Sequence, residues 1–339
     1  MVKNRRANAV MFGFDFQVNA AIVIMLENIE ELQTLRLEGN FEDIEVELDN
    51  HRYILAQAKA VEKSSSDFRN VRKNLEKALI SLSEGSQKVN AQQLILITNS
   101  PNPLNEDASR SVFFGDAHRD FLTLPESSQK LIKSYVDKIT CPLELNKFMI
   151  QILPFETDND AERYKVVRRV VDDFVGDLDI NIPGLGKKLL TLWHEEVFNN
   201  GTKKDPFIQL SKKDVIWPIM VIATNIDSIH QEDGFYNRFD PSVYNEIVYR
   251  YRMIIDSCCE RYEFFVKVLC DYKMYLTSKR KNGLESVIGF ITDKWTDYLA
   301  EFKLDRMDKE VQKGLIQVIL YRIICNRIII DRVKEVVKL

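Results

Sequence analysis

The sequence predicts an α/β domain with a mixed central sheet, followed by a small all-helical domain. Three observations support this. Apolar and acidic residues alternate over 41–48, which is the two-residue period of a strand. Short apolar runs at 94–98 and 147–153 indicate buried strands and lie between segments with helical spacing. Beyond about residue 187, only helical spacing continues. This order of elements is typical of a sheet covered by helices, with a helical domain after it.

The first domain is predicted to begin with a helix and a β-hairpin. Apolar residues at helical spacing predict a helix over 14–33. The strand over 41–48 then turns at Asp49-Asn50-His51 into a returning strand over 53–59. Ser65 or Ser66 is the expected N-cap of the next helix. The remaining predicted elements are helices over 67–84, 126–139 and 159–176 and strands over 94–98 and 147–153.

The segment over 177–186 interrupts the helical pattern with Pro183 and Gly184, so we place the boundary there, between domains over 1–178 and 187–339. The last predicted helix carries apolar residues on more than one face, which predicts burial in its own domain or against another subunit. The predicted helices of the second domain cover 187–199, 211–224, 242–277, 284–302 and 308–337.

Composition narrows the class of protein. The net charge is −4, with 51 acidic and 47 basic residues, so any surface that binds nucleic acid must be a local patch. The five cysteines, at 141, 258, 259, 270 and 325, fit neither a disulfide framework nor a zinc site, and we expect them to be small buried residues in a reducing compartment. No signal peptide and no long uncharged apolar window is evident, which predicts a cytoplasmic protein without a membrane partner.

Asp43, Gln57 and Lys59 form the candidate site. Gln57 and Lys59 are two residues apart on a predicted strand and therefore share a face, and the hairpin lets Asp43 lie beside them. The Asp43 carboxylate and the Gln57 amide oxygen are ligands that Mg²⁺ (or Mn²⁺) accepts, and the main-chain carbonyl of Ala58 is a third candidate. Such a metal polarises a phosphate and lowers the pKa of a bound water. Lys59 would orient that water or offset the charge that develops on phosphorus.

Several further residues are candidates around this site. Glu38 is an additional candidate catalytic residue, and Glu38 and Glu45 are candidate extra ligands or supports. The alternative is a solvated strand edge, on which Lys59 only protects the exposed edge. Basic residues that follow the hairpin are expected either to contact phosphate or to form a solvated face; they are Lys63, Arg69, Arg72, Lys73, Lys77 and Lys88.

Four segments resemble a single nuclease domain. They are Gly13-Phe14-Asp15-Phe16-Gln17, Arg36-Leu37-Glu38-Gly39, Glu42-Asp43-Ile44 and Gln57-Ala58-Lys59. The domain is similar to that of divergent PD-(D/E)XK effector nucleases of bacterial anti-phage defence, including the CBASS-associated double-strand DNA endonucleases. The resemblance covers about residues 10–175 and is strongest before residue 60. It implies a restriction-endonuclease-like fold, catalytic positions for Asp43, Gln57 and Lys59, and supporting positions for Glu38 and Gln17.

The rest of the chain is too short and too helical for the cyclic-oligonucleotide sensor of those effectors. Its arrangement resembles instead the nuclease subunit of Lamassu, the ABC-three-component defence systems. That resemblance implies double-stranded DNA as the substrate, inhibition by an SMC-like ATPase subunit and a small accessory subunit, and a homo-oligomer when active. Aromatic residues of the helical domain are expected either to contact partners or to form core; they are Phe235, Tyr236, Phe239, Tyr244, Tyr249 and Tyr251.

The sequence leaves two other functions open: a non-catalytic adaptor, and a nuclease controlled by a cyclic nucleotide signal. Pro183-Gly184-Leu185-Gly186-Lys187-Lys188 superficially resembles a phosphate loop but lacks the Gly-x-x-x-x-Gly-Lys-Ser/Thr spacing, so we interpret it as a linker. Any ATP dependence must then come from another subunit. Trp193-His194-Glu195-Glu196 lacks the spacing of a zinc protease and is interpreted as ordinary helix.

Overall fold

The computed structural model describes residues 7–64, 66–156, 158–180, 182–224, 235–257, 261–279, 284–302, 304 and 307–339. The chain divides into two compact units. The first comprises Met1–Asp179, Pro183–Val215 and Lys338, and the second comprises Ile180–Ile182, Ile216–Val337 and Leu339.

The first unit is built on a seven-stranded mixed sheet with the strand order β5-β6-β4-β3-β2-β1-β7. Strands β3, β4 and β6 run parallel to one another, and the other neighbouring pairs are antiparallel. The predicted α/β class with a mixed sheet is therefore confirmed. The strands are β1 (Leu32–Leu37), β2 (Ile44–Leu48), β3 (Arg52–Lys59), β4 (Ala91–Thr98), β5 (Ala117–Asp120), β6 (Phe148–Ile152) and β7 (Leu210–Ser211).

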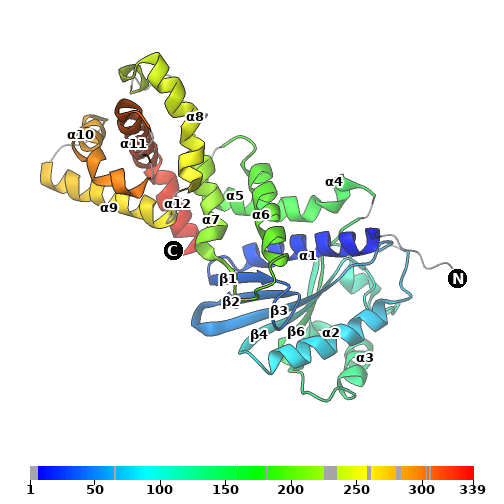
Figure 1. Ribbon diagram of the computed structural model, residues 1–339. Coiled ribbons are helices and arrows are strands. Elements are labelled where there is room, and N and C mark those ends of the chain that lie inside the picture. The colour runs from blue at the N-terminus through cyan, green and yellow to red at the C-terminus, as the bar shows by residue number, and fades with distance from the viewer. Residues whose placement is uncertain are drawn as a thin grey trace. The chain divides into compact units, whose positions relative to one another are not determined.

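Helices cover both faces of this sheet (Figure 1). Helix α1 (Asn8–Glu27) lies on one face and packs against α5 (Lys165–Leu178) and α6 (Leu185–Gly201). Helix α2 (Val71–Ser86) lies on the opposite face beside α3 (Glu126–Val136). The short helix α4 (Asp160–Arg163) precedes α5.

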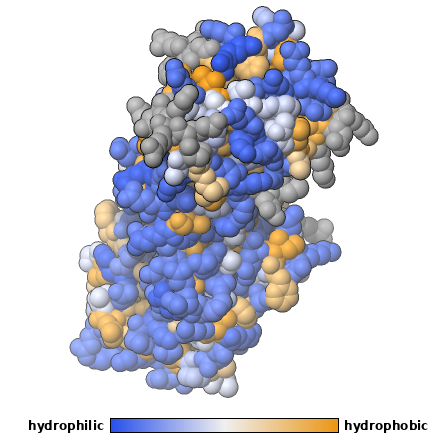
Figure 2. Space-filling model, turned by 90° about the vertical axis from the view of Figure 1, so that its left-hand side faces the viewer, coloured by the Kyte–Doolittle hydropathy of each residue, from blue (hydrophilic) through white to orange (hydrophobic). Residues whose placement is uncertain are grey.

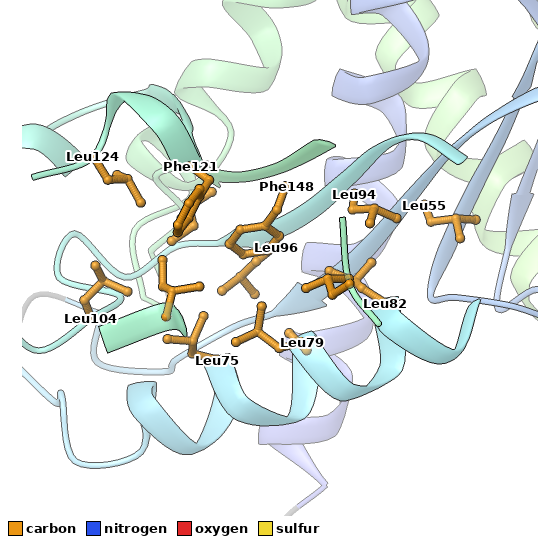
Figure 3. Close-up of a cluster of buried hydrophobic side chains, with 14 of the residues drawn as sticks. Leu55, Leu75, Leu79, Leu82, Leu94, Leu96, Leu104, Phe121, Leu124 and Phe148 are labelled. Atoms are coloured by element: carbon orange, nitrogen blue, oxygen red, sulfur yellow. The ribbon is translucent and has the colours of Figure 1, made fainter. Parts of the chain in front are cut away.

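A leucine-rich core lies between α2 and the sheet (Figure 3). Leu75, Leu79 and Leu82 of α2 are spaced three or four residues apart, so they share one helix face. They pack in one buried cluster with Leu55 of β3 and Leu96 of β4. Each fully buried leucine contributes about 1.5–3 kcal/mol through loss of apolar surface from water. This burial fixes which face of β3 is turned toward α2.

Helix α1 is the core helix of the opposite face. By length and composition alone it is apolar enough to cross a membrane, but most of its apolar window is buried inside the protein. Phe16, Ala20 and Ile24 are fully buried. Figure 2 shows a surface that is mostly hydrophilic on the side in view, with hydrophobic residues in small separate patches. These features are consistent with a soluble protein.

The second unit is helical in the part that the structure describes. Helix α11 is its central element and packs against α8, α9 and α10. Leu315, Val318 and Ile319 of α11 are fully buried, which confirms the burial predicted for this segment. The helices are α7 (Lys212–Ala223), which begins in the first unit, α8 (Pro241–Ser257), α9 (Arg261–Lys279), α10 (Leu284–Lys294), α11 (Lys309–Cys325) and α12 (Arg327–Val337).

The aromatic residues of this unit are divided between core and surface. The Phe235 ring stacks on the Tyr321 ring with a centroid distance of 4.0 Å, and the buried Tyr251 hydroxyl donates a hydrogen bond to the carbonyl of Thr224. Tyr249 is 74% exposed. Of the predicted aromatic group, Phe235 and Tyr251 therefore belong to the core, and Tyr249 is on the surface.

Several predicted elements differ from the structure. The helix predicted over 14–33 begins earlier, at Asn8, and ends at Glu27. Strand β1 begins at Leu32, inside the range predicted as helix. The predicted helix over 159–176 is divided into α4 and α5 around Tyr164. The predicted helix over 308–337 is divided at Asn326. The predicted helix over 284–302 ends at Lys294 and continues as a 3₁₀ helix.

The predicted cap and the predicted burial of cysteine also need correction. Helix α2 begins after Asn70, which makes no side-chain cap, so Ser66 is not the N-cap, and Ser65 lies outside the described residues. Cys270 and Cys325 are exposed and Cys141 is half-buried, so the predicted burial is wrong for these three residues. Cys325 is the last residue of α11, and Cys141 lies in the loop between α3 and β6. Cys258 and Cys259 lie outside the described residues.

Helix α6 belongs to the sheet-containing unit, although it follows the boundary expected at 177–186. Its apolar stripe explains this, because Leu189, Trp193 and Val197 are buried. They follow one another at intervals of four residues and therefore share the face that packs in this unit. The chain passes from the first unit to the second between Val215 and Ile216.

Arg36 ties β1 to the segment that follows α6. Its side chain is 1% exposed, and its guanidinium donates to the main-chain carbonyls of Asn200, Lys203 and Ile208 at 2.6, 2.8 and 2.9 Å. Arg36→Met removes these three charge-assisted hydrogen bonds and takes from the Lys203 carbonyl its guanidinium donor. The carbonyls of Asn200 and Ile208 keep the Lys203 N–H and the Asn200 side-chain amide as donors. We expect the free energy of unfolding to fall by about 3 kcal/mol or more.

Urea unfolding measures this loss. Lys130→Met is the control, because Lys130 and its partner Glu126 are both exposed and such pairs contribute less than about 1 kcal/mol. Equal unfolding midpoints for Arg36→Met and Lys130→Met would show that the buried guanidinium does not hold this segment.

Candidate active site

The β2–β3 hairpin determines which residues of the site lie side by side. Ile44 pairs with Ala56 and Leu48 with Arg52, so Asp43 lies one residue beyond the ladder and beside Gln57. The turn contains Asn50 and His51 with φ of 59° and 54°. Asparagine tolerates this left-handed conformation better than most residues do. The hairpin and turn predicted from the sequence are confirmed.

The Asp43 carboxylate lies beside the end of β3. Its Oδ2 atom accepts a hydrogen bond from the main-chain N–H of Ala58 at 3.0 Å, and the Lys59 Nζ lies 3.4 Å from the same oxygen. The side chains of Asp43 and Lys59 are 21% and 25% exposed. The structure therefore brings together the carboxylate and the ammonium that the sequence singled out, in a place that solvent still reaches.

Gln57 lies on the same face of β3 as Lys59 and Leu55, because side chains two residues apart on a strand project to the same side. Since Leu55 packs under α2, this is the α2 face of the sheet. Gln57 is 6% exposed. Its amide is therefore held in a largely buried position between the hydrophobic core and the Asp43–Lys59 pair.

The Ala58 main chain faces the Asp43 side of β3. Its N–H already donates to Asp43. In an extended strand the N–H and C=O of one residue point toward the same neighbouring strand, so the Ala58 carbonyl is directed to that side as well. Because β2 begins only at Ile44, the ladder does not pair Ala58 with a β2 residue.

These groups suit Mg²⁺ better than a softer metal. Among the residues that the structure describes, no group of three or more His, Cys, Asp or Glu side chains is placed to hold a metal ion. The candidate ligands are one carboxylate (Asp43), one amide oxygen (Gln57) and one main-chain carbonyl (Ala58). Mg²⁺ accepts such a set, because it is bound through one or two carboxylates and keeps several of its waters.

Glu38 contacts both helix α1 and the main chain of Asp43. Its backbone has φ of 52°, and its carboxylate accepts a hydrogen bond from the Gln17 amide of α1 at 3.0 Å. Its main-chain N–H donates to the carbonyl of Asp43 at 2.8 Å. Glu38 and Gln17 therefore contact each other, and Glu38 supports the main chain at Asp43.

Glu45 stabilises the loop that carries Asp43. Its buried carboxylate accepts hydrogen bonds from the N–H groups of Phe41 and Glu42, the latter at 3.0 Å. Burial raises the pKa of Glu45 and these amides lower it. A Cβ on Gly39 would lie 2.1 Å from the Glu45 carboxyl carbon, so the glycine lets this carboxylate approach the loop closely. These contacts favour a supporting role for Glu45.

Glu42 is an acidic residue of this region that the sequence reasoning did not single out. It is 6% exposed and packs near Gly85 of α2. Burial, with the neighbouring Asp43 charge, raises the pKa of Glu42 to about 8. The only sequence signal is the acidic pair Glu42-Asp43, because the burial comes from α2, which follows much later in the chain. At neutral pH this carboxyl is mostly protonated.

The predicted basic residues are exposed and lie before, on and just after α2. Arg69 pairs with Asp67 at 2.7 Å, and Arg72 donates to the carbonyls of Leu104 and Asn105 at 2.9 and 3.1 Å. Lys63, Lys73, Lys77 and Lys88 are exposed as well. Helix α2 covers the sheet face on which Gln57 and Lys59 lie, so these cations are on the same side of the sheet as the candidate site.

Comparison of the chain with protein-family models, with curated proteins and with solved structures found no match.

The raised pKa of Glu42 predicts a pH-dependent stability. Between the ordinary glutamate pKa of 4.5 and about 8, the folded protein keeps a proton that the unfolded chain releases. The free energy of unfolding of the wild type should therefore fall as pH rises through this window, by on the order of a few kcal/mol. Glu42→Gln removes the part of that fall that comes from Glu42, so the variant should lose less stability over this window than the wild type does.

Urea unfolding at pH 5 and pH 8 in EDTA gives the free energy of unfolding of Glu42→Gln and of the wild type, and the loss between the two pH values is compared. The exposed Glu84→Gln on α2 is the control, and its stability should follow the wild type. A Glu42→Gln variant that loses as much stability between the two pH values as the wild type does would contradict a buried, protonated Glu42.

Proposed function

We propose that this chain is a metal-dependent DNA endonuclease of the PD-(D/E)XK type. The observation that carries the proposal is the Asp43–Lys59 contact at 3.4 Å, with Gln57 on the same strand face. An anionic ligand, an amide ligand and a cation then lie next to one another at the end of one β-hairpin. Phosphodiester hydrolysis needs this combination, because a metal must be held beside a positive group that faces the phosphate.

Each residue has a distinct part in the proposed reaction. Asp43, Gln57 and the Ala58 carbonyl would hold Mg²⁺ or Mn²⁺, which supplies a polarised phosphate and a water of lowered pKa. Lys59 donates a hydrogen bond toward the attacking water or a phosphate oxygen and offsets the growing negative charge. Glu38, bound by Gln17, fixes the main chain that carries Asp43.

The surroundings support a restriction-endonuclease-like fold as part of this proposal. A mixed sheet with helices on both faces carries the site at the end of a hairpin, and one of the flanking helices supplies Gln17. Exposed cations of the α2 side offer contacts to the DNA backbone, which are largely independent of sequence. We therefore propose double-stranded DNA as the substrate, with little sequence preference.

The biological setting that we propose is a cytoplasmic anti-phage defence complex of the Lamassu kind. In it, an SMC-like ATPase subunit and a small accessory subunit hold the nuclease inactive, and release allows self-association. Support comes from the helical second unit, which carries the exposed Tyr249 and Met274 as candidate contact residues. Self-association has a physical use, because two sites are needed to cut both strands together.

Catalytic variants test the enzymatic proposal. Asp43→Asn keeps an acceptor for the Ala58 N–H but removes the negative charge, and Lys59→Ala removes the cation. Both should lower the rate of plasmid cleavage in Mg²⁺ by about 100-fold or more. Asp137→Asn and Lys138→Ala, after α3 and away from the hairpin, are the matched controls and should cut like the wild type.

The same assay separates the two other candidate functions. A purified chain that never cuts DNA, and whose Asp43→Asn variant keeps full protection against phage, is an adaptor. Cleavage that appears only after a cyclic nucleotide is added identifies control by a small-molecule signal. Both outcomes contradict release from protein partners as the controlling step.

Metal removal provides a further prediction. EDTA should abolish cleavage, and Mg²⁺ or Mn²⁺ should restore it. Gln57→Glu keeps an oxygen ligand and should retain activity, whereas Gln57→Leu has a similar size without one and should lose it. The two variants are compared by initial cleavage rate over a range of Mg²⁺ concentrations. Equal cleavage rates for Gln57→Leu and the wild type would show that Gln57 is not a metal ligand.

A further inference from the structure

A second polar site lies on the other face of the sheet, where α1, α5 and α6 meet. It is a cavity of about 530 Å³, which is within the range of about 300–1,000 Å³ that is typical of small-ligand pockets. All of its lining residues belong to the sheet-containing unit. They are Asn19, Tyr164, Arg168, Asp172, Gly186, Lys187, Leu190, Thr191 and His194.

One side of the cavity suits an anion. Arg168 and Lys187 both line it, and Lys187 lies in the first turn of the 17-residue helix α6. The N–H groups of that turn have no acceptor within the helix, so the helix start attracts negative charge. Gly184, with φ of 71°, precedes the helix. The segment that resembles a phosphate loop without its spacing is thus the edge of a cavity.

A buried acceptor without a partner also lines the cavity. Asn19 is fully buried, and its amide nitrogen donates to the main-chain and side-chain oxygens of Asp15 at 2.7 and 3.0 Å. Both partners are acceptors, so the orientation of the amide is fixed. Its Oδ1 finds no hydrogen-bond partner among the residues that the structure describes. A buried unsatisfied oxygen in a cavity wall indicates a donor group supplied from outside the chain.

Asp15 also holds the aromatic walls in place. Its carboxylate binds His194 Nε2 at 2.9 Å and accepts a hydrogen bond from the Tyr164 hydroxyl at 3.1 Å. The Arg168 guanidinium lies 5.7 Å from the centre of the Tyr164 ring. The cavity therefore has planar side chains in fixed positions beside its cationic side, a setting that suits a flat, hydrogen-bonding ligand body.

Asp172 adds an acceptor at the same helix end. A Cβ on Gly186 would lie 2.2 Å from its Oδ1, so a glycine at this position lets the carboxylate approach α6. A carboxylate repels phosphate but accepts hydrogen bonds from ribose hydroxyls, as acidic residues do in dinucleotide sites. Together with Asn19 Oδ1, it gives the cavity an acceptor side that faces hydroxyl or amino groups.

We propose that this cavity binds a nucleoside monophosphate or a phosphate ester of the same size and chemistry. The phosphate contacts Arg168 and Lys187 at the start of α6, the sugar hydroxyls face Asp172, and the base lies against Tyr164 and His194 with a donor toward Asn19. The site is on the α1 face of the sheet, whereas Gln57 and Lys59 project to the α2 face. The proposal is therefore independent of the nuclease proposal.

The test is calorimetric titration of the full chain with AMP, GMP, adenosine and inorganic phosphate. At least one of the two nucleotides should bind at one site per chain, and more tightly than adenosine and phosphate. Lys187→Gln and Arg168→Gln should each weaken its binding by about tenfold or more, because each removes a charge-assisted hydrogen bond. Lys188 and Arg169 are the neighbouring residues of the same charge, and they do not line the cavity. The control variants Lys188→Gln and Arg169→Gln should therefore bind the nucleotide like the wild type.

Several results would overturn the proposal. One is the absence of binding by both AMP and GMP, and another is that adenosine or inorganic phosphate binds as tightly as the nucleotide does. A third is that Lys188→Gln and Arg169→Gln weaken nucleotide binding as much as Lys187→Gln and Arg168→Gln do. Thermal unfolding of each variant checks that the fold is kept, which the exposed positions of Lys187 and Arg168 favour. Asp43→Asn should leave nucleotide binding unchanged, so failure of one proposal does not decide the other.

Discussion

The register of the β2–β3 hairpin is the constraint on which the candidate site depends. It places Asp43 next to the end of β3, where the Ala58 N–H and the Lys59 ammonium share one carboxylate oxygen. A shift of one residue would turn Gln57 and Lys59 to the α1 face, because the side chains of a strand alternate. The leucine core under α2 opposes such a shift, since it holds Leu55 on the same face as the site.

Much of this arrangement was predictable from local pattern. Short stretches of sequence are enough to predict three of its elements. They are the strand from the alternation over 41–48, the turn from Asp49-Asn50-His51 and the strand β4 from its apolar run. Strands β5 and β7 gave no such signal. Strand β5 is Ala-His-Arg-Asp and exists because it pairs with the edge of β6, and β7 is two residues long and pairs with β1. Such edge strands are determined by tertiary partners rather than by their own residues.

The site shows the same division between local and distant causes. Spacing alone predicts that Asp43, Gln57 and Lys59 lie together. The direction of Glu38 depends on a left-handed backbone and on Gln17 of α1, and the burial of Glu42 depends on α2. The polar cavity at α1, α5 and α6 is lined by residues as far apart in the sequence as Asn19 and His194, so no local sequence pattern predicts it. A site on one hairpin can therefore be predicted from local spacing, whereas a site assembled from distant helices cannot.

The central claim is that Asp43, Gln57 and Ala58 hold a divalent ion beside Lys59. The most direct measurement is the anomalous diffraction of crystals of this chain soaked in Mn²⁺. The account predicts one strong peak within coordination distance of an Asp43 carboxylate oxygen, the Gln57 amide oxygen and the Ala58 carbonyl. A Mn²⁺ peak away from these three groups would contradict it. So would the absence of a peak in crystals in which Asp43 still accepts hydrogen bonds only from the Ala58 N–H and the Lys59 ammonium.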